Sequence, residues 1–293
     1  AEHHLAHIAS SYFVSDLDKS AALSYDGSGD FASAMSAVCE GTKIDVIGKV
    51  CLPDSLGHFY SSMCQFIGFD LFGEEYKVMG LAPYGEDLFE TEMNKILKID
   101  SLKWFKLNKK MFQTHKGLSE SSLEDGKEMR LGKLYTPKLI ELLGQPRERN
   151  APITQREKNI AKSTQRHFER AATNCLKHLE TKASLKDLVL SGGCSLNGVM
   201  NAKIYRNFDV ENMYIQAAAS DDGTAIGAAF ACWHMHLKQT ERFHMKHAFW
   251  GNEYSPQQIR KAIKLANYSI NEFKTQSQTV EIAANYIAAG SVV

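Results

Sequence analysis

The sequence predicts an α/β domain, and two observations support this fold class. Three apolar runs at 21–26, 31–39 and 44–53 are typical of an antiparallel meander. Further along, a strand, a glycine turn and a helix follow one another twice, over 187–206 and 213–237. Strands that alternate with helices through glycine-rich turns are typical of α/β units whose loops gather at the strand ends. The 293 residues are enough for one large domain or two medium ones.

The first expected element is a helix over 2–13, because its apolar residues recur on one helical face. His3 and His7 are four residues apart, so they project from the same side of that helix. The first two strands are expected to join through a tight turn at 27–29 (GSG), and Pro53 ends the third strand.

Residues 54–84 have helical periodicity and predict two helices, the second of which ends at a Pro/Gly stop. The charged and irregular segment 85–150 is interpreted as an insertion with local helices and a lid role at the active site. A long helix is expected over 154–180. Helices starting at Ser255–Pro256 and spanning 279–289 complete the chain.

Composition excludes few classes of function. Lys plus Arg and Asp plus Glu each number 34, so net charge favours neither a nucleic acid nor a membrane as partner. The six cysteines form no CxxC pair, which favours reduced thiols and a cytoplasmic location. No apolar run is long enough to span a membrane. The chain starts at Ala1 inside a motif and ends in an apolar run, so we expect a fragment of a longer protein.

Two histidines and two aspartates indicate a metal site. His3 and His7 can chelate one divalent cation from a single helical turn, although surface or core histidines share this spacing. Asp26 and Asp221 each precede a glycine turn, from which a carboxylate can reach a common point. Two imidazoles and two carboxylates suit iron(II), manganese or zinc. Position 4 is His4, so the HExxH motif of zinc proteases is absent.

Two glycine turns are candidates for binding a nucleotide. In DGSGD at 26–30, backbone N–H groups lie beside carboxylates, as in phosphate sites, although a plain hairpin turn also uses glycine. SGGCSLN at 191–197 follows an apolar strand and opens a helix, so its N–H groups are expected to face an anion. It lacks the Walker and GxGxxG spacings. Cys194 has no His–Asp partner nearby, which argues against a nucleophilic role.

Five motifs in order, HHLAH, SYDGSGD, GEEYKVMGLAPYG, SGGCSLN and SDDGTAIGAA, resemble the large domain of the O-carbamoyltransferases of antibiotic and nodulation-factor biosynthesis. That domain is similar to the tRNA threonylcarbamoyl-transfer protein. The resemblance implies a ribonuclease-H-like lobe of the actin, sugar-kinase and heat-shock ATPase superfamily. Its implied map is the end of an N-terminal lobe at 1–20, a C-terminal lobe at 21–237, and a linker with the start of an adenylate-synthase-like domain at 238–293.

The resemblance also implies a reaction. Carbamoyl-adenylate, made from ATP and carbamoyl phosphate, donates its carbamoyl group to a hydroxyl of a small-molecule or oligosaccharide acceptor. The family metal is iron(II), and by motif match its ligands are His3, His7, Asp26 and Asp221. The implied nucleotide-binding residues are Gly27, Ser28 and Gly29 in the phosphate hairpin and Gly192, Gly193 and Asn197 in the adenosine loop. His4 is the candidate proton acceptor for the attacking alcohol.

Two alternatives stay open. The first is another enzyme of this superfamily, either a tRNA threonylcarbamoyl-transfer protein or a kinase; Leu5 and Ala6 argue against the former, in which HMEGH is expected. The second is a non-catalytic nucleotide-binding module. Because most of the N-terminal lobe and the adenylate-forming domain are expected to lie outside this fragment, we expect it to bind metal and a nucleotide without completing the overall reaction. The sequence identifies neither the acceptor nor the oligomeric state.

Overall fold

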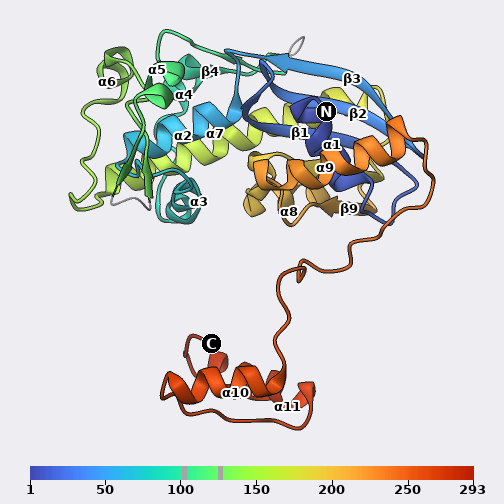
Figure 1. The fold of residues 1–293 in the computed structure, drawn as a ribbon. Coiled ribbons are helices and arrows are strands. Elements are labelled where there is room, and N and C mark those ends of the chain that lie inside the picture. The colour runs from blue at the N-terminus through green and yellow to red at the C-terminus, as the bar shows by residue number, and fades with distance from the viewer. Residues whose placement is uncertain (101–103, 125–127) are drawn as a thin grey trace. The chain divides into compact units, whose positions relative to one another are not determined.

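A five-stranded mixed sheet organises the first part of the molecule (Figure 1). The computed structural model describes residues 1–100, 104–124 and 128–293 and divides the chain into two units, Ala1–Lys246 and His247–Val293. The strand order is β3-β2-β1-β8-β9. Its strands are β1 (Lys19–Gly29), β2 (Ala32–Glu40), β3 (Lys43–Cys51), β8 (Asp187–Ser191) and β9 (Asn212–Ile215).

Both predicted groups of strands belong to this one sheet. The three N-terminal strands pair antiparallel, as expected for a meander. β1 pairs parallel with β8, with Leu23 opposite Leu190, and β8 pairs parallel with β9. The predicted α/β class is therefore confirmed, and the join between β1 and β8 links segments more than 150 residues apart in the sequence.

Helices cover both faces of the sheet. α1 (His3–Tyr12) and α9 (Thr224–Phe230) pack together, and α1 covers β1 and β8. α2 (Leu56–Phe66) and α7 (Gln155–Glu180) pack together and also contact β1. Successive β1 side chains face opposite layers, as strand geometry requires: Ala22 belongs to the core with Ile8 and Phe13, whereas Leu23 and Tyr25 belong to the core with Phe59 and Phe168.

The long helix α7 begins after Thr154, at the position that the predicted helix requires. Thr154 and Glu157 form a complete capping box, in which the Thr154 side chain accepts from a backbone N–H of the first turn and Glu157 accepts from the Thr154 N–H. The predicted helix over 154–180 is therefore confirmed. α8 (Gly198–Asn207) likewise begins after a side-chain cap, Asn197.

The segment over 85–150 contains the expected local helices and also two small hairpins. The helices of this segment are α4 (Glu90–Ile96), α5 (Thr114–Ser119) and α6 (Pro137–Leu143). A further short helix, α3 (Tyr76–Leu81), lies just before the segment. The hairpins are β4 (Leu97–Lys98) with β5 (Lys106–Leu107), and β6 (Ser122–Glu124) with β7 (Glu128–Arg130). The sequence missed these strands because two or three residues are too few for a visible period. Residues 101–103 and 125–127 of the insertion lie outside the described residues.

One local expectation was wrong. The tight turn is not at 27–29: β1 continues through Gly29, and Asp30 and Phe31, both with positive φ, form the two-residue turn. The pairing is irregular between Tyr25 and Gly29, so the intervening residues bulge out of the ladder. The helix expected over 223–237 is confirmed; it is α-helical to Phe230 and continues as a π-helix over Ala231–His236.

The second unit consists of α10 (Pro256–Leu265) and α11 (Gln276–Ala288), and no residue of either helix is buried. The predicted helix start at Ser255 is confirmed, because Ser255 and Gln258 form a capping box. In the part of the chain that the structure describes, no helix has the length and apolar character needed to cross a membrane.

Candidate metal centre

The first turn of α1 presents His3 and His7 on one side, and two side chains hold that turn in place. The Glu2 carboxylate accepts a hydrogen bond from the Leu5 N–H at 2.9 Å, which caps the helix. The His3 N–H donates to Asp30 Oδ2 at 2.8 Å, which ties the helix start to the β1–β2 turn. His7 is fully buried, whereas His3 is partly exposed.

Asp26 lies in the bulge at the end of β1 and is buried. Its two carboxylate oxygens have different partners. Oδ1 accepts a hydrogen bond from the Gly193 N–H at 2.9 Å, and Oδ2 faces the two imidazoles. The amide of the loop after β8 therefore orients this carboxylate toward the histidines, as a supporting contact does for a metal ligand.

Asp221 reaches the same point from the turn before α9, and Gly227 explains how α9 comes so close. A Cβ atom at Gly227 would lie 1.7 Å from the Ala6 carbonyl oxygen of α1, so only glycine permits this approach of two helix backbones. The Asp221 side chain is 67% exposed and forms the open side of the cluster.

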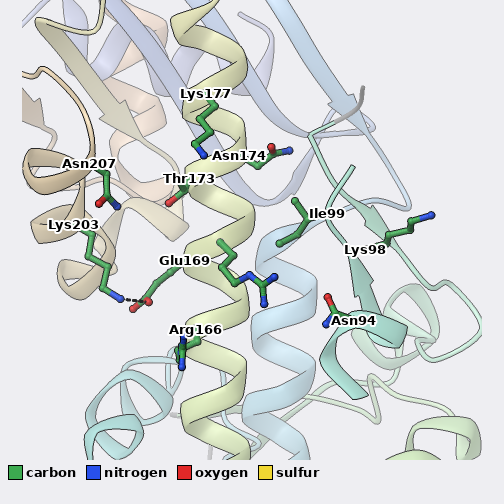
Figure 2. Close-up of a pocket in the computed structure, with 11 residues that line it drawn as sticks. Asn94, Lys98, Ile99, Arg166, Glu169, Thr173, Asn174, Lys177, Lys203 and Asn207 are labelled. Atoms are coloured by element: carbon green, nitrogen blue, oxygen red, sulfur yellow. Dashed lines mark hydrogen bonds and ion pairs between the residues drawn. The ribbon is translucent and has the colours of Figure 1, made fainter. Parts of the chain in front are cut away.

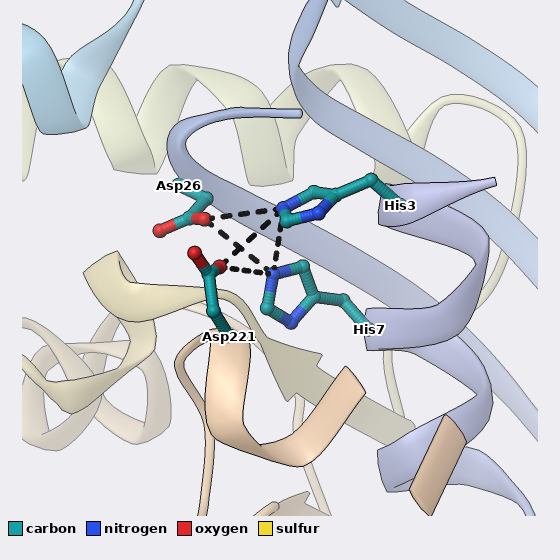
Figure 3. Close-up of side chains that lie close together, drawn as sticks. All are labelled: His3, His7, Asp26 and Asp221. Carbon is teal, nitrogen blue, oxygen red and sulfur yellow. Dashed lines mark hydrogen bonds and ion pairs between the residues drawn. The ribbon is translucent and has the colours of Figure 1, made fainter. Parts of the chain in front are cut away.

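The four side chains converge on one point (Figure 3). The two Nε2 atoms are 3.1 Å apart. Asp26 Oδ2 is 3.4 Å from each Nε2 atom, and Asp221 Oδ1 is 3.5 Å from His3 Nε2 and 3.4 Å from His7 Nε2. Among the residues that the structure describes, this is the one group of three or more potential ligands with this spacing.

Hydrogen bonds alone do not account for this convergence. Each Nε2 atom carries at most one proton, yet each lies within 3.5 Å of three partners. Four donors placed tetrahedrally at about 2.1 Å from a common centre are about 3.4 Å apart, close to the spacings found here. Two imidazole nitrogens and two carboxylate oxygens suit iron(II), manganese or zinc. The residues present therefore fit a divalent metal.

The charges of the cluster are strongly coupled. Burial opposes protonation of His7, but hydrogen bonds to Asp221 and Asp26 outweigh it and raise the pKa of His7 to about 9. Burial also opposes ionisation of Asp26, yet hydrogen bonds from His3 and His7 hold its pKa well below the usual range. Without a cation, a proton on His7 partly neutralises the two carboxylates.

His4 lies beside the cluster and not within it. Its ring has no exposed surface, and Nδ1 is 2.9 Å from Ser24 Oγ. Burial lowers the pKa of His4 to about 4, so the ring is neutral near pH 7. The neutral form is the one that a proton acceptor needs, and the ring is enclosed by protein in this structure.

The bulge at 27–29 lines the cluster and is held by α2. The Ser55 hydroxyl, which caps α2, donates to the Gly27 carbonyl at 2.6 Å. Ser28 Oγ is 3.4 Å from His58 Nε2. A Cβ atom at Gly29 would lie 2.0 Å from the His3 ring, so this glycine provides the space for that ligand.

The expected adenosine loop lies beside the cluster, but several of its groups already have protein partners. The Gly193 N–H binds Asp26, as described. Gly192 has positive φ and packs against the Tyr25 backbone. Asn197 caps α8 and exchanges two hydrogen bonds with Gln165, at 2.9 and 3.0 Å. These contacts give the loop a positioning role.

Three residues that shape this region were not predicted from the sequence: Ser55, His58 and Gly227. Ser55 carried a signal, since a serine before a helical run is a typical N-cap. His58 lines a small pocket of about 240 Å³ with Phe112, Thr114 and other residues of the insertion. Neither the role of His58 nor that of Gly227 has a local signature, because both depend on packing between distant segments.

Comparisons with known proteins identify the family to which the region around the cluster belongs. A family model described as the carbamoyltransferase N-terminus matches residues 1–230. The uncharacterized protein sll1178 of Synechocystis sp. is 31% identical over 100% of this chain and 46% of its own length. The nodulation protein NolNO of Sinorhizobium fredii is 29% identical over 99% of this chain and 39% of its own length.

A solved structure, HypF of T.kodakarensis, aligns over 81% of this chain and 37% of its own, with a TM-score of 0.36 and 15% identity. The chain spans less than half the length of sll1178 and NolNO. The family model matches 230 of the 293 residues and includes all four side chains of the cluster. The chain therefore belongs to the carbamoyltransferase family, whose N-terminal region it carries.

Proposed function

We propose that this chain is the carbamoyl-transfer part of an O-carbamoyltransferase and that His3, His7, Asp26 and Asp221 hold its metal. The convergence of these four side chains is the observation that carries the proposal. We propose iron(II) as the metal and carbamoyl-adenylate, made elsewhere in the full protein from ATP and carbamoyl phosphate, as the donor. A divalent cation held there would stabilise the negative charge of the adenylate phosphate.

The proposed fold is a ribonuclease-H-like lobe of the actin, sugar-kinase and heat-shock ATPase superfamily. The mixed five-stranded sheet, with α1 and α9 against one side and α2 and α7 against the other, supports this assignment. The proposed domain map keeps 1–20 as the end of an N-terminal lobe, 21–237 as the C-terminal lobe and 238–293 as a linker with the start of the next domain.

In the proposed reaction, the acceptor oxygen attacks the carbamoyl carbon and the bond between that carbon and the phosphate oxygen breaks. AMP leaves with the electron pair, and the hydroxyl proton is released. Ser28 and the backbone N–H groups of the bulge would hold the phosphate, because they lie beside the cluster and are partly exposed. Gly192, Gly193 and Asn197 would shape the adenosine side of the site.

We propose that the acceptor hydroxyl approaches through the pocket beside His58. This pocket is lined by residues of the insertion and adjoins the bulge through the contact between Ser28 and His58. Burial lowers the pKa of His58 to about 4, so its neutral ring can accept a hydrogen bond from the hydroxyl. His4, which is enclosed, would instead position α1 through Ser24.

The test is the metal content of anaerobically purified full-length protein, measured by elemental mass spectrometry. We expect about one iron per chain, and much less after Asp221→Asn or His3→Ala. Asp222→Asn is the matched control, since Asp222 is the exposed neighbour that lies outside the cluster. Transfer of a radiolabelled carbamoyl group to an acceptor should be lost with the metal and survive in the control.

Three results would contradict the proposal. An absence of metal from the anaerobic protein would remove the cluster as a metal site. Metal retained after both His3→Ala and Asp221→Asn would place the ion elsewhere. Loss of metal with full carbamoyl transfer would separate the ion from the reaction.

A further inference from the structure

A large polar pocket lies along α7, and the carbamoyl-transfer proposal makes no use of it (Figure 2). Its volume is about 760 Å³, within the range of small-molecule sites. α7 forms its floor, and residues of α4 and of α8 form its two sides. Of the eleven residues that line it, only Ile99 is apolar. Such a pocket fits a ligand that is recognised by hydrogen bonds and charge.

The α7 residues of the pocket form one stripe. Arg166, Arg170, Thr173 and Lys177 follow one another at intervals of three or four residues and so share one helical face. In Figure 2 the Lys177 ammonium group points along this face toward Thr173, on the side of α8. A flexible lysine and a hydroxyl thus lie together at the α7–α8 side of the pocket.

α8 contributes a second ammonium group whose position is fixed. Lys203 forms a close ion pair with Glu169, and the Glu169 carboxylate is buried and also accepts a hydrogen bond from Gln165 at 2.9 Å. Removing a carboxylate from water costs free energy, so such a pair is weak evidence for stability by itself. Its consequence here is that Lys203 is held at the pocket wall near Asn207 (Figure 2).

The two arginines of the stripe are already neutralised. Arg166 Nη1 is 3.0 Å from Asp87 Oδ2, and Arg170 Nη1 is 2.5 Å from Glu90 Oε1. Lys98 and Lys177 have no carboxylate partner among the described residues. Five cations therefore meet three carboxylates, and the two unpaired ammonium groups lie on opposite sides of the pocket, Lys98 on the side of α4 and Lys177 on the side of α8 (Figure 2). The whole chain has zero net charge, so this excess is local.

We infer that the α7–α8 side of this pocket binds a phosphate group, either inorganic phosphate or the phosphate of a small phosphomonoester. Lys177, Lys203, Thr173 and Asn207 offer two ammonium groups, a hydroxyl and an amide from two facing helices. A phosphate anion matches this supply of donors, because the Lys177 ammonium has no carboxylate partner among the described residues and Lys203, Thr173 and Asn207 add further donors on the same side. The site is separate from the metal cluster and does not rest on the proposed function.

The test is isothermal titration of the chelator-treated full-length protein with inorganic phosphate at constant ionic strength. Lys177→Gln removes the unpaired ammonium from an exposed position and should weaken binding about tenfold, the value of one charge-assisted hydrogen bond. Lys138→Gln is the control, because Lys138 is also exposed but lies on α6, outside the pocket. The double variant Glu169→Met and Lys203→Met removes the fixed donor without changing net charge, and it should also weaken binding about tenfold.

Each other outcome would overturn the inference. Absence of binding at millimolar phosphate would leave the pocket as a solvated surface. Equal losses in Lys177→Gln and Lys138→Gln would indicate non-specific electrostatic attraction. Binding that needs the metal and survives Lys177→Gln would place the phosphate at the metal cluster instead. Titration with a phosphomonoester such as glycerol phosphate then distinguishes the two sources of the phosphate group.

Discussion

Two groups of charged side chains lie in the first unit, and they differ in how their charges are balanced. Around Glu74, each carboxylate has its own cation: Lys77 Nζ is 2.5 Å from Glu74 Oε1, and Arg149 bridges Glu74 and Asp70 at 2.9 and 2.7 Å. In the metal cluster, two carboxylates face two imidazoles, and each Nε2 atom can carry at most one proton. The first group is complete as a structural element, whereas the donor set of the second suits a central cation.

The comparison gives a criterion for interpreting polar clusters. In the Glu74 group, each contact joins an N–H donor to a carboxylate oxygen: Oε1 accepts from Lys77 and Arg149 at 2.5 and 3.2 Å, and Oε2 accepts from Arg149 and the Leu71 N–H at 2.9 and 3.0 Å. In the metal cluster, all contacts crowd around the same few atoms at 3.1–3.5 Å. Contacts that each have a donor proton indicate a network that stabilises the fold, whereas convergent contacts that outnumber the available protons indicate ligand atoms around a cation.

The largest expected effect is on metal affinity. Asp26→Asn keeps the shape of the side chain but replaces a charged ligand oxygen, so affinity should fall more than about 100-fold, beyond the loss typical of a supporting contact. Competition with a fluorescent chelator measures this loss. Glu74→Gln is the matched control and should keep its metal. If Asp26→Asn binds metal like the unchanged protein, the distinction between the two groups is wrong.

The next effect tests whether helix packing delivers the fourth ligand. Gly227→Val introduces atoms where the Ala6 carbonyl lies and should lower the free energy of unfolding by about 3 kcal/mol. Metal affinity should fall as well, because α9 must move away and carries Asp221 with it. Urea denaturation and metal analysis measure the two losses. Ala228→Val, on the same helix, is the control and should have a smaller effect on both.

The Glu74 group should affect stability and its dependence on pH. Despite burial, hydrogen bonds from Arg149 and Lys77 lower the pKa of Glu74 to about 2 from an ordinary value of 4.5. Its contribution is therefore complete above pH 4.5 and is lost as pH falls toward 2. Glu74→Gln should lower the free energy of unfolding by about 2 kcal/mol at pH 7.

Denaturation of both proteins between pH 6 and pH 2.5 tests this prediction. The difference between them should shrink across that interval. A constant difference would mean that Glu74 stabilises the protein through packing and not through its charge.

The smallest effect is the pH dependence of metal binding. Because the pKa of His7 is raised to about 9, binding must displace a proton at any lower pH. Affinity should therefore fall up to about tenfold for each pH unit below 9, equivalent to about 1.4 kcal/mol. Metal titrations at pH 6.5, 7.5 and 8.5 check this slope. An affinity independent of pH would show that His7 is already deprotonated in the metal-free protein.

The sequence predicted the elements of the fold better than their connections. Helix starts at Thr154 and Ser255 were readable because capping is local. The parallel pairing of β1 with β8 was not predicted, since it joins segments more than 150 residues apart. The turn at Asp30–Phe31 was misplaced because GSG looks like a turn, whereas these glycines lie in a bulge and one gives space to His3.

In the candidate site too, the sequence predicted the residues but not the contacts between distant segments. Residue types and motif order were enough to name His3, His7, Asp26 and Asp221, which the structure brings together; their metal remains a prediction. The contacts that orient those side chains could not be predicted from the sequence, because they are made by backbone groups. The Gly193 N–H and the close approach at Gly227 have no side-chain chemistry to recognise in a sequence.

The unequal exposure of the four side chains bears on how fast a metal would enter and leave. His7 and Asp26 are buried and His3 is partly covered, so three of the four ligand groups are enclosed by protein. Asp221 lies at the exposed edge of the site. Asp221 lies in a short 3-10 turn at the surface, and its side chain is the most exposed of the four. We therefore expect an arriving ion to bind the three enclosed ligands first and Asp221 last. Removing this carboxylate should therefore speed metal dissociation far more than it slows capture.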